Sequence, residues 1–165
     1  FDGRKLDDIT DFLTYAFIPL FYMAVSGRVP LPWGLPVLAL VLLVAAYGFC
    51  RGAAKTDDGY FTGFPNFWNL AVFYLYIFDP APLVNLFILV FLAANMWVPI
   101  KYMSFSTRPY RRLSVLLTLA FAVALVMIGI QLESPNMLLV YLSLLFPIYY
   151  TGMSIYLTLR KPGEM

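Results

Sequence analysis

The chain has 165 residues, of which 62% are hydrophobic and only 12% are charged, and its formal net charge is +2. Soluble domains are about one-quarter charged, so this composition, with a mean hydropathy of +0.80, predicts an integral membrane protein. The sequence has no histidine, which excludes the usual zinc ligand and the usual acid–base group of neutral pH. Metal chemistry would have to rest on carboxylates, which suit Mg²⁺ or Mn²⁺.

Six apolar runs follow one another along the chain, and each predicts a membrane helix. They cover residues 12–25, 31–49, 67–78, 81–100, 113–132 and 137–159. Pro19 is expected to disturb the first run, and the third run is short for a span. Asn85 and Asn95 in the fourth run are expected to make hydrogen bonds between helices. We therefore predict an all-α polytopic helical bundle with six transmembrane helices, forming one domain over residues 1–165.

Three carboxylates stand just before the first apolar run, in the segment from Gly3 to Asp11. In a helix, Gly3, Asp7 and Asp11 lie on one face, each a little over a turn apart, with Asp8 beside them. One interpretation is a helix N-terminus, where Asp7 and Asp8 interact favourably with the helix dipole. The other is half of a divalent-metal site, because an acidic stripe beside a membrane helix is costly without a partner, a metal or water. The spacing leaves both interpretations open.

The basic residues fall on alternate connections between the apolar runs, so that all of them except Arg28 lie on one side of the predicted membrane. By the positive-inside rule that side is cytoplasmic, and both termini lie there. The acidic segment and the pair Asp57 and Asp58 fall on the same side. The basic residues of this side are Arg4, Lys5, Arg51, Lys55, Lys101, Arg108, Arg111, Arg112, Arg160 and Lys161.

Gly3, Asp7 and Asp11 form the pattern G-x-x-x-D-x-x-x-D. This pattern resembles the second half of the signature of the CDP-alcohol phosphatidyltransferases, which is D-x-x-D-G-x-x-A-R, a spacer, and G-x-x-x-D-x-x-x-D. Together with the sequence KTDDGYFTGFP at residues 55–65, it is similar to the bacterial branch of this family that makes phosphatidylcholine. The first half of the signature is absent. We therefore expect the chain to be N-terminally incomplete, with two more helices before it in the full protein.

The resemblance implies a transferase that joins choline to CDP-diacylglycerol to give phosphatidylcholine and releases CMP, with Mn²⁺ or Mg²⁺ as cofactor. It implies that Asp7 and Asp11 hold the metal and that Asp11 is also the general base for the alcohol. Gly3 matches the glycine near the nucleotide, and Asp8, outside the motif, is expected to support donor binding or to cap the helix. The chemistry agrees, because a diphosphate needs its charge neutralised and a hydroxyl needs a base before it attacks.

The basic residues on the predicted cytoplasmic side have two interpretations. We expect Lys101, Arg108, Arg111 and Arg112 mainly to set the topology and to contact anionic lipid headgroups. The functional alternative is that an arginine contacts a phosphate of the donor, for which its fork geometry is well suited. The candidates for donor binding are Lys55, Arg108 and Arg111.

The segment from Lys55 to Trp68 combines a pair of carboxylates with several aromatic side chains. Choline carries a fixed positive charge without N–H groups, and such a cation is bound by aromatic faces with a carboxylate nearby. The alternative is an aromatic belt at the membrane interface. The residues that we predict to bind choline are Asp57, Asp58, Tyr60, Phe61, Phe64 and Trp68.

Two alternatives remain open for the function. Serine or another small alcohol is the alternative acceptor, and a helical transporter or assembly subunit is the alternative class of protein. The transporter class is disfavoured because the charges gather at one membrane face and the sequence has no pair of helices broken by glycine or proline. We expect a multi-pass protein of the bacterial inner membrane with no nucleic-acid partner, and the resemblance adds a homodimer as an expectation.

Overall fold

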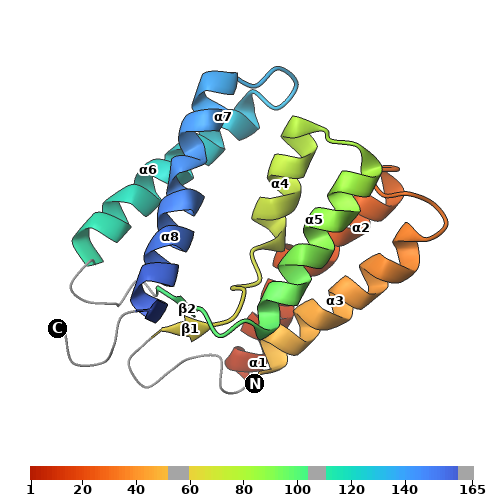
Figure 1. Ribbon diagram of the computed structural model, residues 1–165, viewed down its shortest axis with the longest axis horizontal. Helices are drawn as coiled ribbons and strands as arrows, with labels where there is room; N and C mark the ends of the chain where they lie inside the picture. Colours follow the sequence, from red (N-terminus) through yellow and green to blue (C-terminus); the bar gives the residue numbers. More distant parts are fainter. Residues whose placement is uncertain (52–59, 104–110, 160–165) are drawn as a thin grey trace. The chain divides into compact units, whose positions relative to one another are not determined.

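Helices make up about three-quarters of the chain that the structure describes. The structure is a computed structural model that describes residues 1–51, 60–103 and 111–159 (Figure 1). Its contacts divide the chain into two compact units, the first made of residues 1–54 and 63–99 and the second of residues 55–62 and 100–165. Helices cover all six predicted apolar runs, and the all-α membrane class is thereby confirmed.

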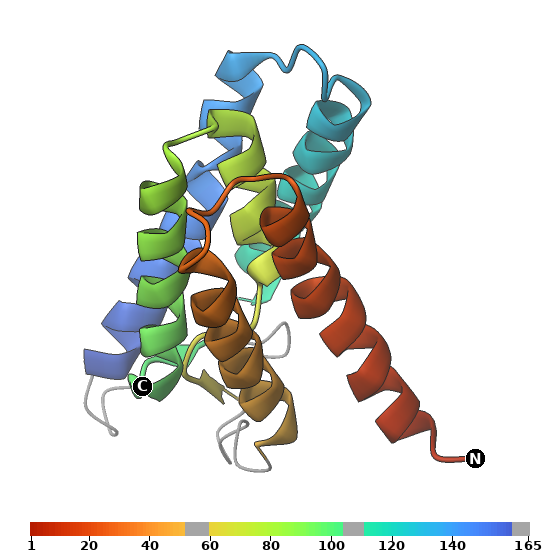
Figure 2. The same cartoon turned by 90° about the vertical axis from the view of Figure 1, so that its right-hand side faces the viewer.

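The first unit opens with one long helix (Figure 2). Its winding changes part-way along. It consists of α1 (Gly3–Asp11), the π-helical segment η1 (Phe12–Phe17) and α2 (Ile18–Val25). Pro19 accounts for the change, because proline has no N–H to bond the carbonyl one turn before it. The disturbance predicted at Pro19 is therefore a π-helical stretch that ends just before the proline.

Three shorter apolar helices complete the first unit. They are α3 (Gly34–Cys50), α4 (Trp68–Phe78) and α5 (Pro82–Ala94), the last extended by the 3₁₀ turn η2 (Asn95–Trp97). α3 packs along α5, and α4 packs against α2 (Figure 1). These helices share a core with the first helix, and its buried side chains include Ala16, Leu20, Met23, Leu38, Val41, Ala45, Trp68, Val72, Leu75 and Leu89.

The second unit combines a short antiparallel strand pair with the remaining helices. Strand β1 (Phe61–Thr62) pairs antiparallel with β2 (Lys101–Tyr102). α6 (Arg111–Ile130) packs against α7 (Met137–Ser143), and α8 (Leu145–Leu159) packs against β2 (Figure 1). The two strands are only two residues long, so they form one short strand pair and not a β-layer.

The sixth apolar run, predicted as one helix, is interrupted between α7 and α8 at Leu144. The N–H of Leu144 reaches the carbonyls of both Val140 and Tyr141, at 3.3 and 3.2 Å. Pro147 follows within one turn and has no N–H for the carbonyl of Ser143. The regular α-helical bonding pattern is therefore lost over this turn.

The helices differ in whether they are long enough to span a membrane. Three stretches are long and apolar enough by length and composition, namely Gly3–Val25, Arg112–Ile130 and Met137–Leu159. The remaining three are shorter. α4, with 11 residues, is about 16 Å long, whereas the hydrocarbon core of a bilayer is about 30 Å thick.

Arg28 joins two loops at one end of the first unit. Its guanidinium pairs with Asp79 at 2.6 Å and lies 4.9 Å from the centre of the Tyr76 ring. Its Nε donates a hydrogen bond to the Tyr22 hydroxyl at 3.2 Å, and its carbonyl accepts one from Asn85 Nδ2 at 2.9 Å. The one basic residue on the far side of the predicted topology is therefore used for packing between α2, α4 and α5.

The prediction that Asn85 and Asn95 bond between helices is wrong. Asn85 Nδ2 donates to the loop carbonyls of Arg28 and Pro80, at 2.9 and 3.3 Å. Asn95 Nδ2 donates to the carbonyl of Phe91 in its own helix, at 2.8 Å. Asn85 lies near the start of α5, beside the loop carbonyls that it bonds, and Asn95 directly follows the end of α5.

Candidate active site

The acidic segment is helical, and its helix begins before Asp7 and Asp8. Asp2 is the N-cap, since its carboxylate accepts a hydrogen bond from the Lys5 N–H at 3.2 Å, and α1 begins at Gly3. The first turn therefore contains no acidic residue. The interpretation of Asp7 and Asp8 as first-turn residues that favour the helix dipole is wrong, as is the capping role considered for Asp8, because Asp2 already fills that position.

Asp11 lies where α1 passes into the apolar π-helical segment. It is half-buried, whereas every other residue of α1 is exposed. The next residue, Phe12, packs edge-on against Phe49 near the end of α3, with ring centres 6.1 Å apart. Arg51 follows α3 and donates a hydrogen bond to the carbonyl of Met96 at 3.5 Å. Asp11 thus directly precedes the residue that packs near the end of α3.

The carboxylates of α1 repel one another. Asp7 and Asp11 are one turn apart on the same helix face, and Asp8 lies beside them. Among the described residues, the Asp11 carboxylate accepts no hydrogen bond and forms no ion pair. A cation bound to this face would relieve the repulsion.

The described residues supply only part of a metal site. Within residues 1–51, 60–103 and 111–159, no group of three or more Cys, Asp or Glu side chains is arranged to hold a metal ion. Asp7 and Asp11 fit a hard divalent cation by ligand type, since Mg²⁺ and Mn²⁺ prefer carboxylate oxygens. They would need further ligands from outside α1, and the metal prediction stays a prediction.

Gly3, the first residue of the pattern, has open space around it. A side chain built there would meet no atom within 4 Å. Packing of the described residues therefore does not explain why this position is a glycine, in contrast to Gly48, where a Cβ would lie 2.7 Å from the Met96 side chain.

The aromatic residues predicted to form one choline site divide between the two units. Tyr60 belongs to the second unit, is 6% exposed, and has the Lys101 ammonium 5.6 Å from its ring centre. Phe64 and Trp68 belong to the first unit, where their rings meet edge-on at 5.0 Å. Trp68 is fully buried, and its indole N–H donates to Asn66 Oδ1 at 3.1 Å. This burial favours a packing role for Trp68.

Several predicted site residues lie outside the part that the structure describes. Lys55, Asp57, Asp58 and Arg108 fall in the undescribed segments, and of Phe61 and Arg111 only the backbone is described. Their roles stay predictions.

The chain is similar to several curated bacterial proteins, each named phosphatidylcholine synthase. It is 34% identical to the one from Legionella bozemanae, over 97% of this chain and 76% of that protein. It is 33% identical to the one from Borreliella burgdorferi, over 96% of this chain and 69% of that protein. The chain belongs to the phosphatidylcholine synthase family.

The share of each chain that the match covers differs between the relatives. The phosphatidylcholine synthase of Legionella pneumophila is 40% identical, but the match covers 61% of this chain and only 40% of that protein. No family model and no solved structure matches the chain. Membership of the wider CDP-alcohol phosphatidyltransferase family therefore stays a prediction. The prediction of an enzyme, a phosphatidylcholine synthase of a bacterial membrane, is confirmed at the level of the family.

Two structural features of this member of the phosphatidylcholine synthase family are not predicted from its sequence. Asn66 has a positive φ of 57° and bridges the Trp68 indole and the carbonyl of Ala45, to which its Nδ2 donates at 3.4 Å. Lys101, which the sequence marks only as a basic residue of the predicted cytoplasmic side, has its ammonium over the Tyr60 ring. The nearest sequence signal for Asn66 is its place in a Gly- and Pro-containing loop, because asparagine tolerates left-handed backbone. No local pattern predicts the contact between residues 60 and 101.

Proposed function

We propose that this chain catalyses transfer of the phosphatidyl group from CDP-diacylglycerol to choline. The choline oxygen forms a bond to the phosphorus that carries diacylglycerol, the bond from that phosphorus to the CMP oxygen breaks, and CMP leaves. The hydroxyl proton passes to the enzyme. The products are phosphatidylcholine and CMP. The proposal is supported chiefly by the similarity to phosphatidylcholine synthases along nearly the whole chain.

In this proposal Asp11 is the general base. A hydroxyl is a weak nucleophile until a base takes its proton, and a positioned carboxylate can do so. Three features support the choice: Asp11 ends the acidic face of α1, it is the least exposed residue of that helix, and its carboxylate is not bonded to any described residue.

Asp7 and Asp11 would contribute two carboxylates to the binding of Mn²⁺ or Mg²⁺, with other ligands from outside α1. A bound divalent cation would neutralise charge on the donor diphosphate. The exposed face of α1 holds both carboxylates one turn apart, and the open space at Gly3 lets a large anionic donor approach the backbone.

The remaining predicted residues keep their roles as proposals. Asp8, Lys55, Arg108 and Arg111 would assist donor binding, and the two aspartates and the aromatic residues of segment 55–68 would surround choline. The basic residues named above would place the active site and both termini on the cytoplasmic face of the inner membrane. A homodimer is proposed from the resemblance alone.

The deciding experiment measures CMP release from CDP-diacylglycerol by the purified protein in detergent or liposomes. The acceptors are choline, serine and ethanolamine, each with Mg²⁺, Mn²⁺ or EDTA. We expect CMP release with choline, formation of phosphatidylcholine in equal amount, and loss of both with EDTA. Preference for serine would replace the acceptor. No CMP release with any alcohol would refute the transferase and favour the transporter or assembly-subunit class.

A further inference from the structure

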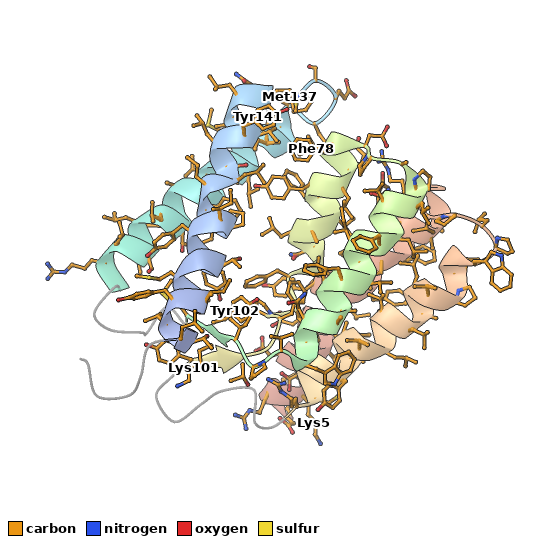
Figure 3. The ribbon with its side chains drawn as sticks, in the orientation of Figure 1. Lys5, Phe78, Lys101, Tyr102, Met137 and Tyr141 are labelled. Atoms are coloured by element: carbon orange, nitrogen blue, oxygen red, sulfur yellow. The ribbon has the colours of Figure 1, made fainter. Side chains whose placement is uncertain are left out.

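The apolar part of the first long helix is much shorter than the helix itself. The stretch Gly3–Val25 is long enough to span a membrane, but α1 carries charged side chains, and only residues 12–25 contain none. These residues extend over about 21 Å, compared with about 30 Å for the hydrocarbon core of an ordinary bilayer. Lys5, in α1, lies at the opposite end of the first unit from Phe78, the last residue of α4 (Figure 3). Any tilt of the helix shortens its reach across the membrane further.

Exposed side chains mark a similar length on α3 and α5. Trp33, just before α3, and Tyr47 are both exposed, and they are about 21 Å apart along the helix axis. On α5 and η2, the exposed Leu83 and Trp97 have the same separation in sequence. The Tyr47 and Trp97 rings stack with their centres 6.4 Å apart, so the two helices reach the same level at this end. Tryptophan and tyrosine favour the headgroup level of a bilayer, which places its two interfaces at Trp33 and at this ring pair.

Polar groups bound the apolar layer at both ends of the first unit. At one end, Arg28 and Asp79 form an ion pair at 2.6 Å, and the Asp79 side chain is 74% exposed. A charge exposed to hydrocarbon is costly, so this pair requires water or lipid headgroups around it. At the other end, the contact of Phe12 with Phe49 brings the charged helix α1 to the end of α3. Between these polar ends, the first unit has room for an apolar layer of only about 21 Å.

The long helices of the second unit have the ordinary length of membrane spans. Arg112–Ile130 has 19 residues and Met137–Leu159 has 23. They are about 28 and 34 Å long, so they fit a hydrocarbon core of about 30 Å with modest tilt. The short apolar length is therefore a property of the first unit and not of every helix that the structure describes.

We propose that the lipid-facing surface of the first unit is matched to about 21 Å of hydrocarbon and thins the bilayer around it. Local thinning accommodates a short hydrophobic stretch at a modest cost. In a bilayer of ordinary thickness, Asp11 or the pair of Arg28 and Asp79 would lie inside the hydrocarbon, whereas thinning brings headgroups to both ends. The consequence for catalysis rests on the proposed function. The diphosphate of the donor lies at headgroup level, so thinning brings it to the level of Asp11.

Tryptophan fluorescence tests the lipid contacts of the first unit alone. All three tryptophans of the sequence belong to this unit, and Trp33 and Trp97 are exposed whereas Trp68 is fully buried. The full chain is placed in phosphatidylglycerol vesicles, and brominated lipids with chains of about 14, 18 or 22 carbons compete as quenchers. We expect the shortest lipid to be preferred over the longest by about twofold or more. Equal quenching by all three lipids, or preference for the longest, would overturn the inference.

Two variants test whether the bilayer thins or the first unit sinks into it. Trp97→Phe leaves Trp33 as the lipid-exposed reporter, and Trp33→Phe leaves Trp97. In vesicles with chains of about 18 carbons, both reporters should be quenched more by bromines near the headgroup than by bromines midway along the chains. Stronger quenching of either reporter by the deeper bromines would show that the bilayer keeps its thickness, against the inference.

CMP release separates this inference from the proposed function. In vesicles of the same three chain lengths, turnover should be highest in the shortest lipid and several-fold lower in the longest. Trp33→Phe and Trp97→Phe should keep native turnover, because neither residue belongs to the proposed site. A preference for short lipids without CMP release in any lipid refutes the proposed function alone. CMP release together with equal quenching by all three lipids refutes this inference alone.

Discussion

Asp11→Asn is the substitution that most directly tests the chemistry, because the structure predicts opposite effects on rate and on stability. The Asp11 carboxylate accepts no hydrogen bond from the described residues, so the amide removes no contact there. It does remove one charge from a like-charged pair with Asp7, and such pairs one turn apart destabilise a helix by about 0.2–0.5 kcal/mol. Thermal stability should therefore stay the same or rise slightly.

The rate should fall steeply in the same variant. General base catalysis contributes about 10²–10⁴ in rate, which corresponds to about 2.7–5.4 kcal/mol of activation free energy at about 1.36 kcal/mol per tenfold. The assay is single-turnover CMP release at saturating donor and choline, with melting followed in parallel. Binding of CDP-diacylglycerol should change less than the rate.

Asp2→Asn is the matched control for Asp11→Asn. Asparagine caps a helix as well as aspartate does, so the hydrogen bond to the Lys5 N–H is kept while one negative charge leaves the same helix. We expect turnover of this control within about twofold of the native enzyme. An Asp11→Asn enzyme within tenfold of native turnover would refute the assignment of the base. An equal loss in the control would mean that the net charge of α1 matters and not the base.

Three further variants test neighbouring steps. Asp7→Ala should raise the Mg²⁺ or Mn²⁺ concentration needed for half-maximal activity, and a metal titration that does not move would leave Asp7 without a role in metal binding. Gly3→Ala meets no described atom within 4 Å, so melting should not be lowered while the KM for CDP-diacylglycerol rises several-fold; an unchanged donor KM would remove Gly3 from the site. Trp68→Phe leaves the buried Asn66 Oδ1 without its donor, which should cost about 1–3 kcal/mol of stability. The choline KM of Trp68→Phe should not change, and a raised KM at native stability would return Trp68 to the choline site.

The helical part of the fold is predictable because long apolar runs leave the backbone few alternatives in a membrane. The position of Asp7 and Asp11 on one helix face also follows from spacing alone. The start of α1 does not, because three nearby aspartates compete as caps and the sequence favours none of them. Asp2 is the N-cap in the structure, and that choice moves Asp7 and Asp8 into the second turn.

The pairing of β1 with β2 is the part of the structure that could not be predicted from the sequence. Two-residue strands carry no alternating pattern, and the paired segments lie about 40 residues apart along the chain. Lys101 therefore looks like any other basic residue of a cytoplasmic loop. Its contact with Tyr60 follows only from the pairing of Thr62 with Lys101.

The aromatic residues of segment 60–68 illustrate why composition cannot assign a cation site. By residue type alone, Trp68 would be a better cation–π partner than Tyr60. Trp68 is fully buried, its N–H is bonded to Asn66, and its nearest ring neighbour is Phe64. Tyr60 has an ammonium over its ring. The groups that contact each ring therefore distinguish the two roles. Tyr60 is the stronger candidate for binding choline, and Trp68 is the stronger candidate for packing.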